Sequence, residues 1–120
     1  MNGVKEIRGA EFQNEVLDSK APVLVDFFTP WCGPCRALAP ALEGIAKTCE
    51  GRLKVVKVNV DDAQQLAADY RIQGVPTLMF FKDGINVDTI VGLPSAGVLR
   101  NKLDAIADSP LQTCACRCCA

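Results

Sequence analysis

The chain has 120 residues, the length of one domain, and its 49% apolar and 22% charged residues are ordinary for a soluble globular protein. Thirteen basic and fourteen acidic side chains leave a net charge of −1, which argues against a broad nucleic-acid-binding face and a polybasic membrane anchor. Histidine is absent, which excludes Ser-His and Cys-His catalytic pairs and histidine-ligated zinc. Acid–base chemistry must therefore come from thiols, carboxylates, lysines or the single tyrosine.

The seven cysteines fall into two groups. Three are Cys32, Cys35 and Cys49, and the other four crowd the last seven residues as Cys114, Cys116, Cys118 and Cys119. A secreted disulfide framework usually spreads its cysteines through a shorter chain. Residues 1–8 lack the apolar segment of a signal peptide, and no apolar run approaches the roughly 18 residues of a membrane span. We therefore expect a cytoplasmic protein without membrane or nucleic-acid partners, in which a C-x-x-C motif is catalytic or binds metal.

Apolar runs typical of strands alternate with helical spacing along the chain. In order, the predicted elements are a weak strand at 4–7, a helix at 12–17, a strand at 23–28, a helix over 38–46, a strand at 53–60, a short helix from 61 to 70, strands at 77–81 and 87–91, and a helix over 95–106. The strand at 23–28 is continuously apolar apart from Asp26, as in strands buried on both faces of a sheet. Pro40 should kink its helix because it lacks the N–H for an intrahelical bond.

Polar and turn residues mark where the later elements begin. Asp61 and Asp62 are predicted to cap the short helix, and Ser95 the last one. The turn at 82–84 joins the last two strands into a hairpin.

Strands that are joined by helix-length connections are expected to pair in parallel, and the hairpin adds an antiparallel edge. The sequence therefore predicts an α/β domain over residues 1–108. Its central mixed sheet has a parallel core plus the antiparallel hairpin and is flanked by helices on both faces. Residues 109–120 are predicted to be a flexible, Cys-rich tail.

The segment Trp31-Cys-Gly-Pro-Cys35 lies directly after the strand at 23–28 and begins the next helix. Pro34 fits the first helical position, so Cys32 lies just ahead of the helix, where free N–H groups and the macrodipole favour a thiolate. Cys35 falls on the first turn, within disulfide reach. We therefore predict that an exposed Cys32 attacks a substrate disulfide and that a more buried Cys35 resolves the mixed disulfide. The alternative is half of a zinc site, whose other ligands could come only from Cys49, the tail or carboxylates.

Asp26 is a carboxylate inside an apolar strand, where an unpaired charge is costly and the group tends to take up a proton. A raised pKa is what a general base near neutral pH requires. The alternative is a solvated aspartate at a strand edge.

The chain from about residue 4 to residue 107 resembles the thioredoxin family. The motifs that carry the resemblance are Val25-Asp26-Phe27, Trp31-Cys-Gly-Pro-Cys35, Pro40, Lys57, Gly74-Val75-Pro76-Thr77, Lys82-Asp83-Gly84 and Gly92. The resemblance implies the thioredoxin fold and a general protein-disulfide reductase that acts as a monomer, with no bound cofactor beyond the redox-active Cys32–Cys35 disulfide. It also implies recycling by a thioredoxin reductase, either NADPH- or ferredoxin-linked.

The resemblance further implies roles for individual residues. Pro76 should be cis and pack against the active-site disulfide, and the backbone of Val75 should pair with the substrate like an added strand. Asp26, with Lys57 close to it, should assist proton transfer at the resolving thiol through water. The expected substrate-binding surface comprises Trp31, Gly33, Pro34, Val75, Pro76 and Gly92, with a core position as the alternative for Trp31. Phe28, Thr29 and Pro30 depart from the usual family pattern without removing a catalytic group.

The cysteines of the tail lie outside the resemblance. Cys114, Cys116, Cys118 and Cys119 have the composition of a soft-metal site, but a closed cage of four thiolates usually needs two separated pairs. Two other interpretations are that the tail cysteines form a redox relay or a mixed disulfide with Cys32, or that the tail has no part in the core function. Two rival functions follow: a metal-binding module that depends on the tail, and a docking module that uses the domain surface without turnover.

Overall fold

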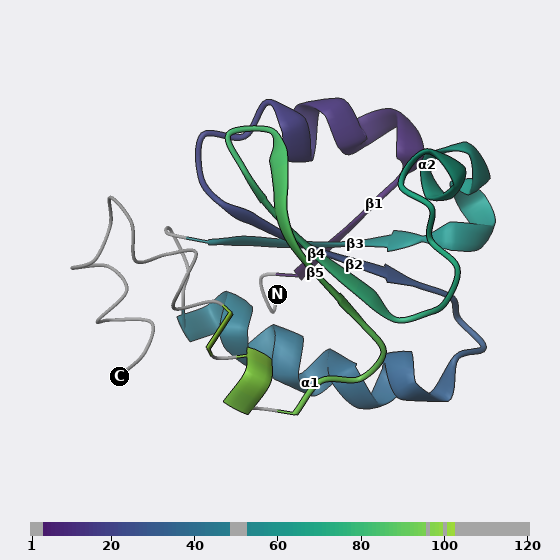
Figure 1. The fold of residues 1–120 in the computed structure, drawn as a ribbon, viewed down its shortest axis with the longest axis vertical. Coiled ribbons are helices and arrows are strands. Elements are labelled where there is room, and N and C mark those ends of the chain that lie inside the picture. Colours follow the sequence, from purple (N-terminus) through teal and green to yellow (C-terminus); the bar gives the residue numbers. More distant parts are fainter. Residues whose placement is uncertain (1–3, 49–52, 96, 100, 103–120) are drawn as a thin grey trace.

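The computed structural model describes residues 4–48, 53–95, 97–99 and 101–102, and Figure 1 shows their arrangement. The strands are β1 (Val4–Ile7), β2 (Val23–Phe28), β3 (Lys54–Asn59), β4 (Thr77–Lys82) and β5 (Ile85–Val91). The helical segments are η1 (Gly9–Glu11), η2 (Gln13–Leu17), α1 (Gly33–Thr48), η3 (Val60–Asp62) and α2 (Gln64–Asp69). Residues 97–99 and 101–102 are also helical.

The five strands form one mixed sheet in the order β1-β3-β2-β4-β5. β3 runs parallel to β1 and β2, whereas β4 runs antiparallel to both β2 and β5. In Figure 1, α1 and the helical residues 97–99 lie on one side of the sheet, and η1, η2 and α2 lie on the other. The predicted mixed sheet with helices on both faces is therefore confirmed.

Alternating side chains of the strands divide the core into two layers. Leu24, Val55, Leu78 and Phe80 pack with Leu38 and Leu42 of α1 and with Leu99. Val25, Phe27, Val56, Val58, Met79 and Phe81 pack on the other face with Phe12, Val16 and Ala63. This alternation is the period-two pattern expected of strands that are covered on both faces.

The predicted parallel pairing is wrong for the strand that follows α2. The register places Asn59, at the end of β3, beside Phe28, and Thr77, at the start of β4, beside Phe27. The chain therefore re-enters the sheet at the end where β3 left it. A connection that begins and ends at the same end of the sheet makes β4 antiparallel to β2 and β3, whereas a helix-length crossover would return the chain to the opposite end.

Local signals predicted some element ends better than others. Asp61 and Asp62 do not cap α2, which begins after Ala63; they lie in η3, where the Asn59 side chain accepts a hydrogen bond from Asp61 N at 2.9 Å. Ser95 does cap the last helix, because its Oγ accepts from Val98 N at 3.2 Å. The predicted helix at 12–17 is a π-helical turn, η2, and the 3-10 turn η1 directly precedes it.

α1 continues through Pro40 as one helix, and the predicted kink stays a prediction. The hairpin turn between β4 and β5 holds Asp83 and Gly84 at positive φ, and a Cβ on Gly84 would lie 2.9 Å from Leu17 O. The predicted boundary between the domain and its tail, at residues 108 and 109, lies outside the described residues.

Candidate active site

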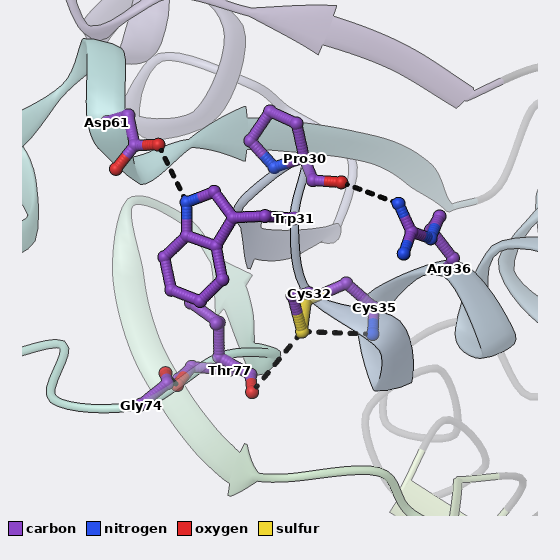
Figure 2. The surroundings of a disulfide bond; sticks show 9 residues. Pro30, Trp31, Cys32, Cys35, Arg36, Asp61, Gly74 and Thr77 are labelled. Carbon is purple, nitrogen blue, oxygen red and sulfur yellow. Dashed lines mark hydrogen bonds between the residues drawn. A yellow bond between two sulfur atoms is a disulfide. The ribbon is translucent and has the colours of Figure 1, made fainter.

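Cys32 and Cys35 form a disulfide where β2 passes into α1. Their Cα atoms are 5.3 Å apart. Cys32 directly precedes α1, which begins at Gly33, so Pro34 is the second helical residue rather than the first. Cys35 N donates to Cys32 Sγ at 3.2 Å, as a backbone N–H of the first turn does to an N-cap side chain (Figure 2). The start of α1 thus directs a hydrogen-bond donor and the positive end of its dipole at the Cys32 sulfur.

The predicted difference in exposure between the two cysteines is wrong for the disulfide form. Cys32 is 6% exposed and Cys35 is 4% exposed, so both are buried. What separates the two thiols is their position on the helix: Cys32 lies ahead of it, whereas Cys35 lies in its first turn. A cap position lowers a thiol pKa more than a position inside the turn, because more free N–H groups point toward it.

The Gly74–Thr77 loop lies against Cys32. The Val75–Pro76 peptide bond is cis, and Val75 O lies 3.7 Å from Cys32 Sγ. Thr77 Oγ1 donates to Gly74 O at 2.6 Å, and Gly92 N donates to Pro76 O at 2.8 Å. These two hydrogen bonds fix the loop from within and from the end of β5, so the Val75 backbone is held beside the sulfur.

Three large apolar side chains on the segments next to Cys32 and the Gly74–Thr77 loop are exposed: Trp31, Val91 and Leu93. We refer to them as the contact surface. Trp31 is 70% exposed, and its Nε1 donates to Asp61 Oδ2 at 3.2 Å, which holds the ring at the surface (Figure 2). Val91 pairs with Thr77 across the sheet, and its Cγ1 lies 4.0 Å from where a Gly74 Cβ would stand. The contact surface therefore adjoins the cis-proline loop.

The glycines and Pro34 that the sequence assigned to substrate binding leave the surface around the disulfide open. Gly33 and Pro34 are exposed, and Gly92 is half-buried. No atom lies within 4 Å of a Cβ built on Gly33 or Gly92. Gly92 also has a φ of +90°, a conformation that L side chains rarely adopt.

Asp26 lies in the central strand of the sheet and is only 3% exposed. It pairs with Lys57 on β3 and with Leu78 on β4, so it is not a solvated residue at a strand edge. Burial raises the pKa of Asp26 from its usual 3.8 to about 7, and the positive charge of Lys57 opposes part of this rise. Lys57 Nζ itself lies 5.2 Å from the centre of the Phe28 ring.

A cavity of about 120 Å³ connects Asp26 with the disulfide. Asp26, Thr29 and Cys35 line it together with Lys57, Arg36 and Glu43. Arg36 and Glu43 are exposed, so the cavity runs from the buried carboxyl to the protein surface. The cavity thus gives Cys35 and the raised-pKa carboxyl of Asp26 a common space.

Three residues of the site were not predicted from the sequence. Thr29 lines the cavity, Asp61 holds Trp31, and Arg36 Nη1 donates to Pro30 O at 3.0 Å across the loop that carries Trp31 (Figure 2). The sequence could have indicated Thr29, because its hydroxyl directly follows the apolar run at 23–28 that was predicted to be buried. The pairing of Asp61 with Trp31 joins residues 30 positions apart, and no local pattern indicates it.

The described residues contain no group of three or more His, Cys, Asp or Glu side chains that could hold a metal ion. Cys49 and the tail cysteines Cys114, Cys116, Cys118 and Cys119 lie outside the described part of the chain, as do the interpretations that depend on them. No helix within the described ranges is long and apolar enough to cross a membrane.

Comparison with known proteins agrees with this geometry. The family model described as Thioredoxin matches residues 3–105. Thioredoxin 1 of Synechococcus elongatus is 49% identical over 104 residues, and Thioredoxin 1 of Nostoc sp. is 48% identical over 104 residues. Thioredoxin of Synechocystis sp. is 45% identical over 104 residues. Each of these matches covers 87% of this chain and 97% of the relative.

Proposed function

Because the chain belongs to the thioredoxin family, whose members reduce disulfides by dithiol exchange, we propose that Cys32 attacks and Cys35 resolves in this reaction. The protein is a thiol–disulfide oxidoreductase whose redox-active group is the Cys32–Cys35 pair. Its partners are disulfide-containing substrates and a thioredoxin reductase that returns it to the dithiol. The observation that carries the division of roles is the hydrogen bond from Cys35 N to Cys32 Sγ at the start of α1.

The first step is attack by the Cys32 thiolate on a substrate disulfide. A new S–S bond joins Cys32 to the substrate, the substrate S–S bond breaks, and its second sulfur leaves as a thiolate that takes up a proton. The free N–H groups at the start of α1 stabilise the attacking thiolate, because the helix dipole is positive there.

The second step releases the substrate. The Cys35 thiol gives up its proton and attacks Cys32 Sγ; the mixed disulfide breaks, and the reduced substrate leaves after protonation. Asp26 is the proposed acceptor of the Cys35 proton, because both groups line one cavity. A carboxyl with a pKa of about 7 can accept and return a proton near neutral pH.

Substrate binding is proposed to use the Val75 backbone and the contact surface. A peptide joined to Cys32 has to pass near Val75, whose carbonyl oxygen lies 3.7 Å from the attacking sulfur. Added-strand pairing there would depend on backbone groups and so tolerate many sequences. Pro76 positions this loop, and the exposed Gly33 and Pro34 and the open space beside Gly92 leave room for the partner chain.

The proposal also includes the cofactor, the reductase, the oligomeric state and the location of the protein. The dithiol carries both electrons, so the reaction needs no bound cofactor beyond it. The reductase is NADPH- or ferredoxin-linked, the protein acts as a monomer, and it works in the cytoplasm, where thiols are kept reduced.

The test is dithiothreitol-driven reduction of insulin disulfides by the full chain and by Cys32→Ser and Cys35→Ser variants. We expect rapid reduction by the wild type, no turnover by either variant, and a stable mixed disulfide with Cys35→Ser only. A mixed disulfide that accumulates on Cys35 in the Cys32→Ser variant would reverse the two roles. A wild type that does not reduce insulin would reject the proposed function and favour the docking module.

A further inference from the structure

Two buried polar atoms near the disulfide lack a hydrogen-bond partner. They are Asp26 Oδ1 and Thr29 Oγ1, and in the described part of the chain no other buried side-chain nitrogen or oxygen is in this position. Each residue is only 3% exposed. Proteins pair nearly all such atoms with protein groups or ordered water, because an unpaired buried polar group is costly.

The two atoms belong to residues that line the same cavity as Cys35. The volume of about 120 Å³ exceeds the roughly 30 Å³ that one molecule occupies in liquid water, and a buried water needs two to four polar partners. The backbone of Thr29 is fixed at this place, because Thr29 O accepts from Cys32 N at 3.2 Å. The position of the hydroxyl is therefore tied to the loop that carries the attacking cysteine.

We propose that Thr29 is a positioning residue whose hydroxyl, together with Asp26 Oδ1, binds a water molecule that connects the Asp26 carboxyl with the Cys35 thiol. The proposal rests on the proposed function, in which Asp26 accepts the proton of Cys35. Proton transfer through water is what the family resemblance implies; the new element is Thr29, which the sequence marked only as a departure from the family pattern. A water at this place pairs both orphaned atoms at once.

The water fits the resolving step with atoms and electrons in balance. The Cys35 S–H proton moves to the water, and the water passes one of its own protons to the Asp26 carboxylate. The Cys35 thiolate then forms the S–S bond with Cys32, and the electron pair of the broken mixed disulfide leaves with the substrate sulfur. The Thr29 hydroxyl donates to the water oxygen and stays unchanged.

The charges around this water come from two elements that border the cavity. Lys57 on β3 is the register partner of Asp26, and Arg36 and Glu43 of α1 lie at the exposed end of the cavity. Leu78, the neighbour of Asp26 on β4, is apolar. A change at Thr29 leaves all of these charges in place, so its effect on Asp26 reports the hydroxyl alone.

The first test is a pH titration of the Asp26 carboxyl, monitored by carbon-detected NMR in the disulfide form of the full chain. Thr29→Val keeps the shape and removes the hydroxyl, whereas Thr29→Ser keeps the hydroxyl and removes the methyl. We expect Thr29→Val to raise the titration midpoint by about one pH unit, because the carboxylate loses a bound water, and Thr29→Ser to change it little. An unchanged midpoint in Thr29→Val, or equal shifts in both variants, would overturn the proposal.

The second test is the rate at which the mixed disulfide resolves in a single turnover, measured across the pH range. We expect Thr29→Val to slow it by about three- to tenfold at pH 7, and Thr29→Ser to stay within about twofold. In an Asp26→Asn background the Thr29→Val change should have no further effect, and an undiminished effect there would overturn the proposal. Failure of the wild type to reduce insulin rejects the proposed function instead, and the titration still decides whether the hydroxyl holds the water.

Discussion

One region next to the Cys32–Cys35 disulfide buries polar side chains, whereas another exposes apolar ones. In the cavity, Asp26 and Thr29 are both 3% exposed and retain orphaned oxygens. On the contact surface, Trp31, Val91 and Leu93 are each more than half exposed. Both arrangements oppose the ordinary distribution, in which apolar groups are buried and polar groups are solvated or paired.

The two departures serve different parts of one reaction. A carboxyl whose pKa is raised by burial to about 7 can accept a proton from a thiol and return it near neutral pH. An exposed apolar side chain can leave water and pack against a substrate. We therefore expect the cavity to determine how activity and stability depend on pH, and the contact surface to determine the affinity for substrate.

The largest effect is expected at the disulfide, which lies between the two regions. Cys32→Ser should lower insulin reduction by about a thousandfold or more, because it removes the attacking thiolate. Initial rates with dithiothreitol as reductant measure this loss. Cys35→Ser serves as the control, since it should still form one mixed disulfide per chain; a Cys32→Ser variant that turns over would contradict both roles.

The cavity should make stability fall as pH rises. An acid whose pKa is raised on folding stabilises the folded state fully below its unfolded pKa, and this contribution is lost as pH rises through the folded value. For Asp26, with a pKa raised from 3.8 to about 7, the free energy of unfolding should fall by about 4 kcal/mol between pH 4 and pH 8. Urea unfolding across this range measures it.

Asp26→Asn should remove most of that slope and lower insulin reduction at pH 7 by about tenfold, because the proton acceptor is lost. Asp88→Asn is a matched control with the opposite sign. The hydrogen bond from Lys102 lowers the pKa of Asp88, so its contribution to stability is lost as pH falls. A wild-type slope that persists in Asp26→Asn would assign the pH dependence to another group.

The contact surface should affect affinity rather than stability. Val91→Asp and Leu93→Asp should each raise the KM for insulin by roughly fivefold, while the unfolding free energy changes little. Ile85→Asp is the control, because Ile85 is equally apolar and exposed on β5 but lies at the end of the strand far from Gly92. Equal KM values for Val91→Asp, Leu93→Asp and Ile85→Asp would show that the surface near Trp31 has no special part in binding.

The smallest effect is expected from the tail, which belongs to neither region. Replacing Cys114, Cys116, Cys118 and Cys119 together by serine should leave insulin reduction within about twofold of the wild type, since the proposed dithiol cycle closes within Cys32 and Cys35. A larger change would place the tail thiols in the redox cycle.

Local sequence predicted the parts of this site that depend on neighbours along the chain. An apolar run, a C-x-x-C motif and a following helix indicated the disulfide at the start of α1, and Asp26 inside that run indicated a buried carboxyl. The direction of β4 could not be read from periodicity, because a strand has the same pattern in either direction. It follows from the end of the sheet at which the chain re-enters after β3, which the register shows.

The burial of individual atoms could not be predicted from the sequence, because it depends on how distant segments pack together. Cys32 is buried in the disulfide form, although a position ahead of a helix suggested exposure. The orphaned hydroxyl of Thr29 follows from how α1 packs against β2, and the contact between Trp31 and Asp61 follows from where β3 ends. These are tertiary consequences that no single window of sequence contains.

The central place of β2 in the sheet should protect the site from local unfolding. β2 is hydrogen-bonded to β3 on one side and to β4 on the other, and the cysteines follow directly from its end. The amide hydrogens of such a strand exchange with deuterated solvent only when the sheet itself opens. We therefore expect slow exchange along β2, to whose end the dithiol is attached, while local fraying at β1 or β5 leaves the dithiol in place.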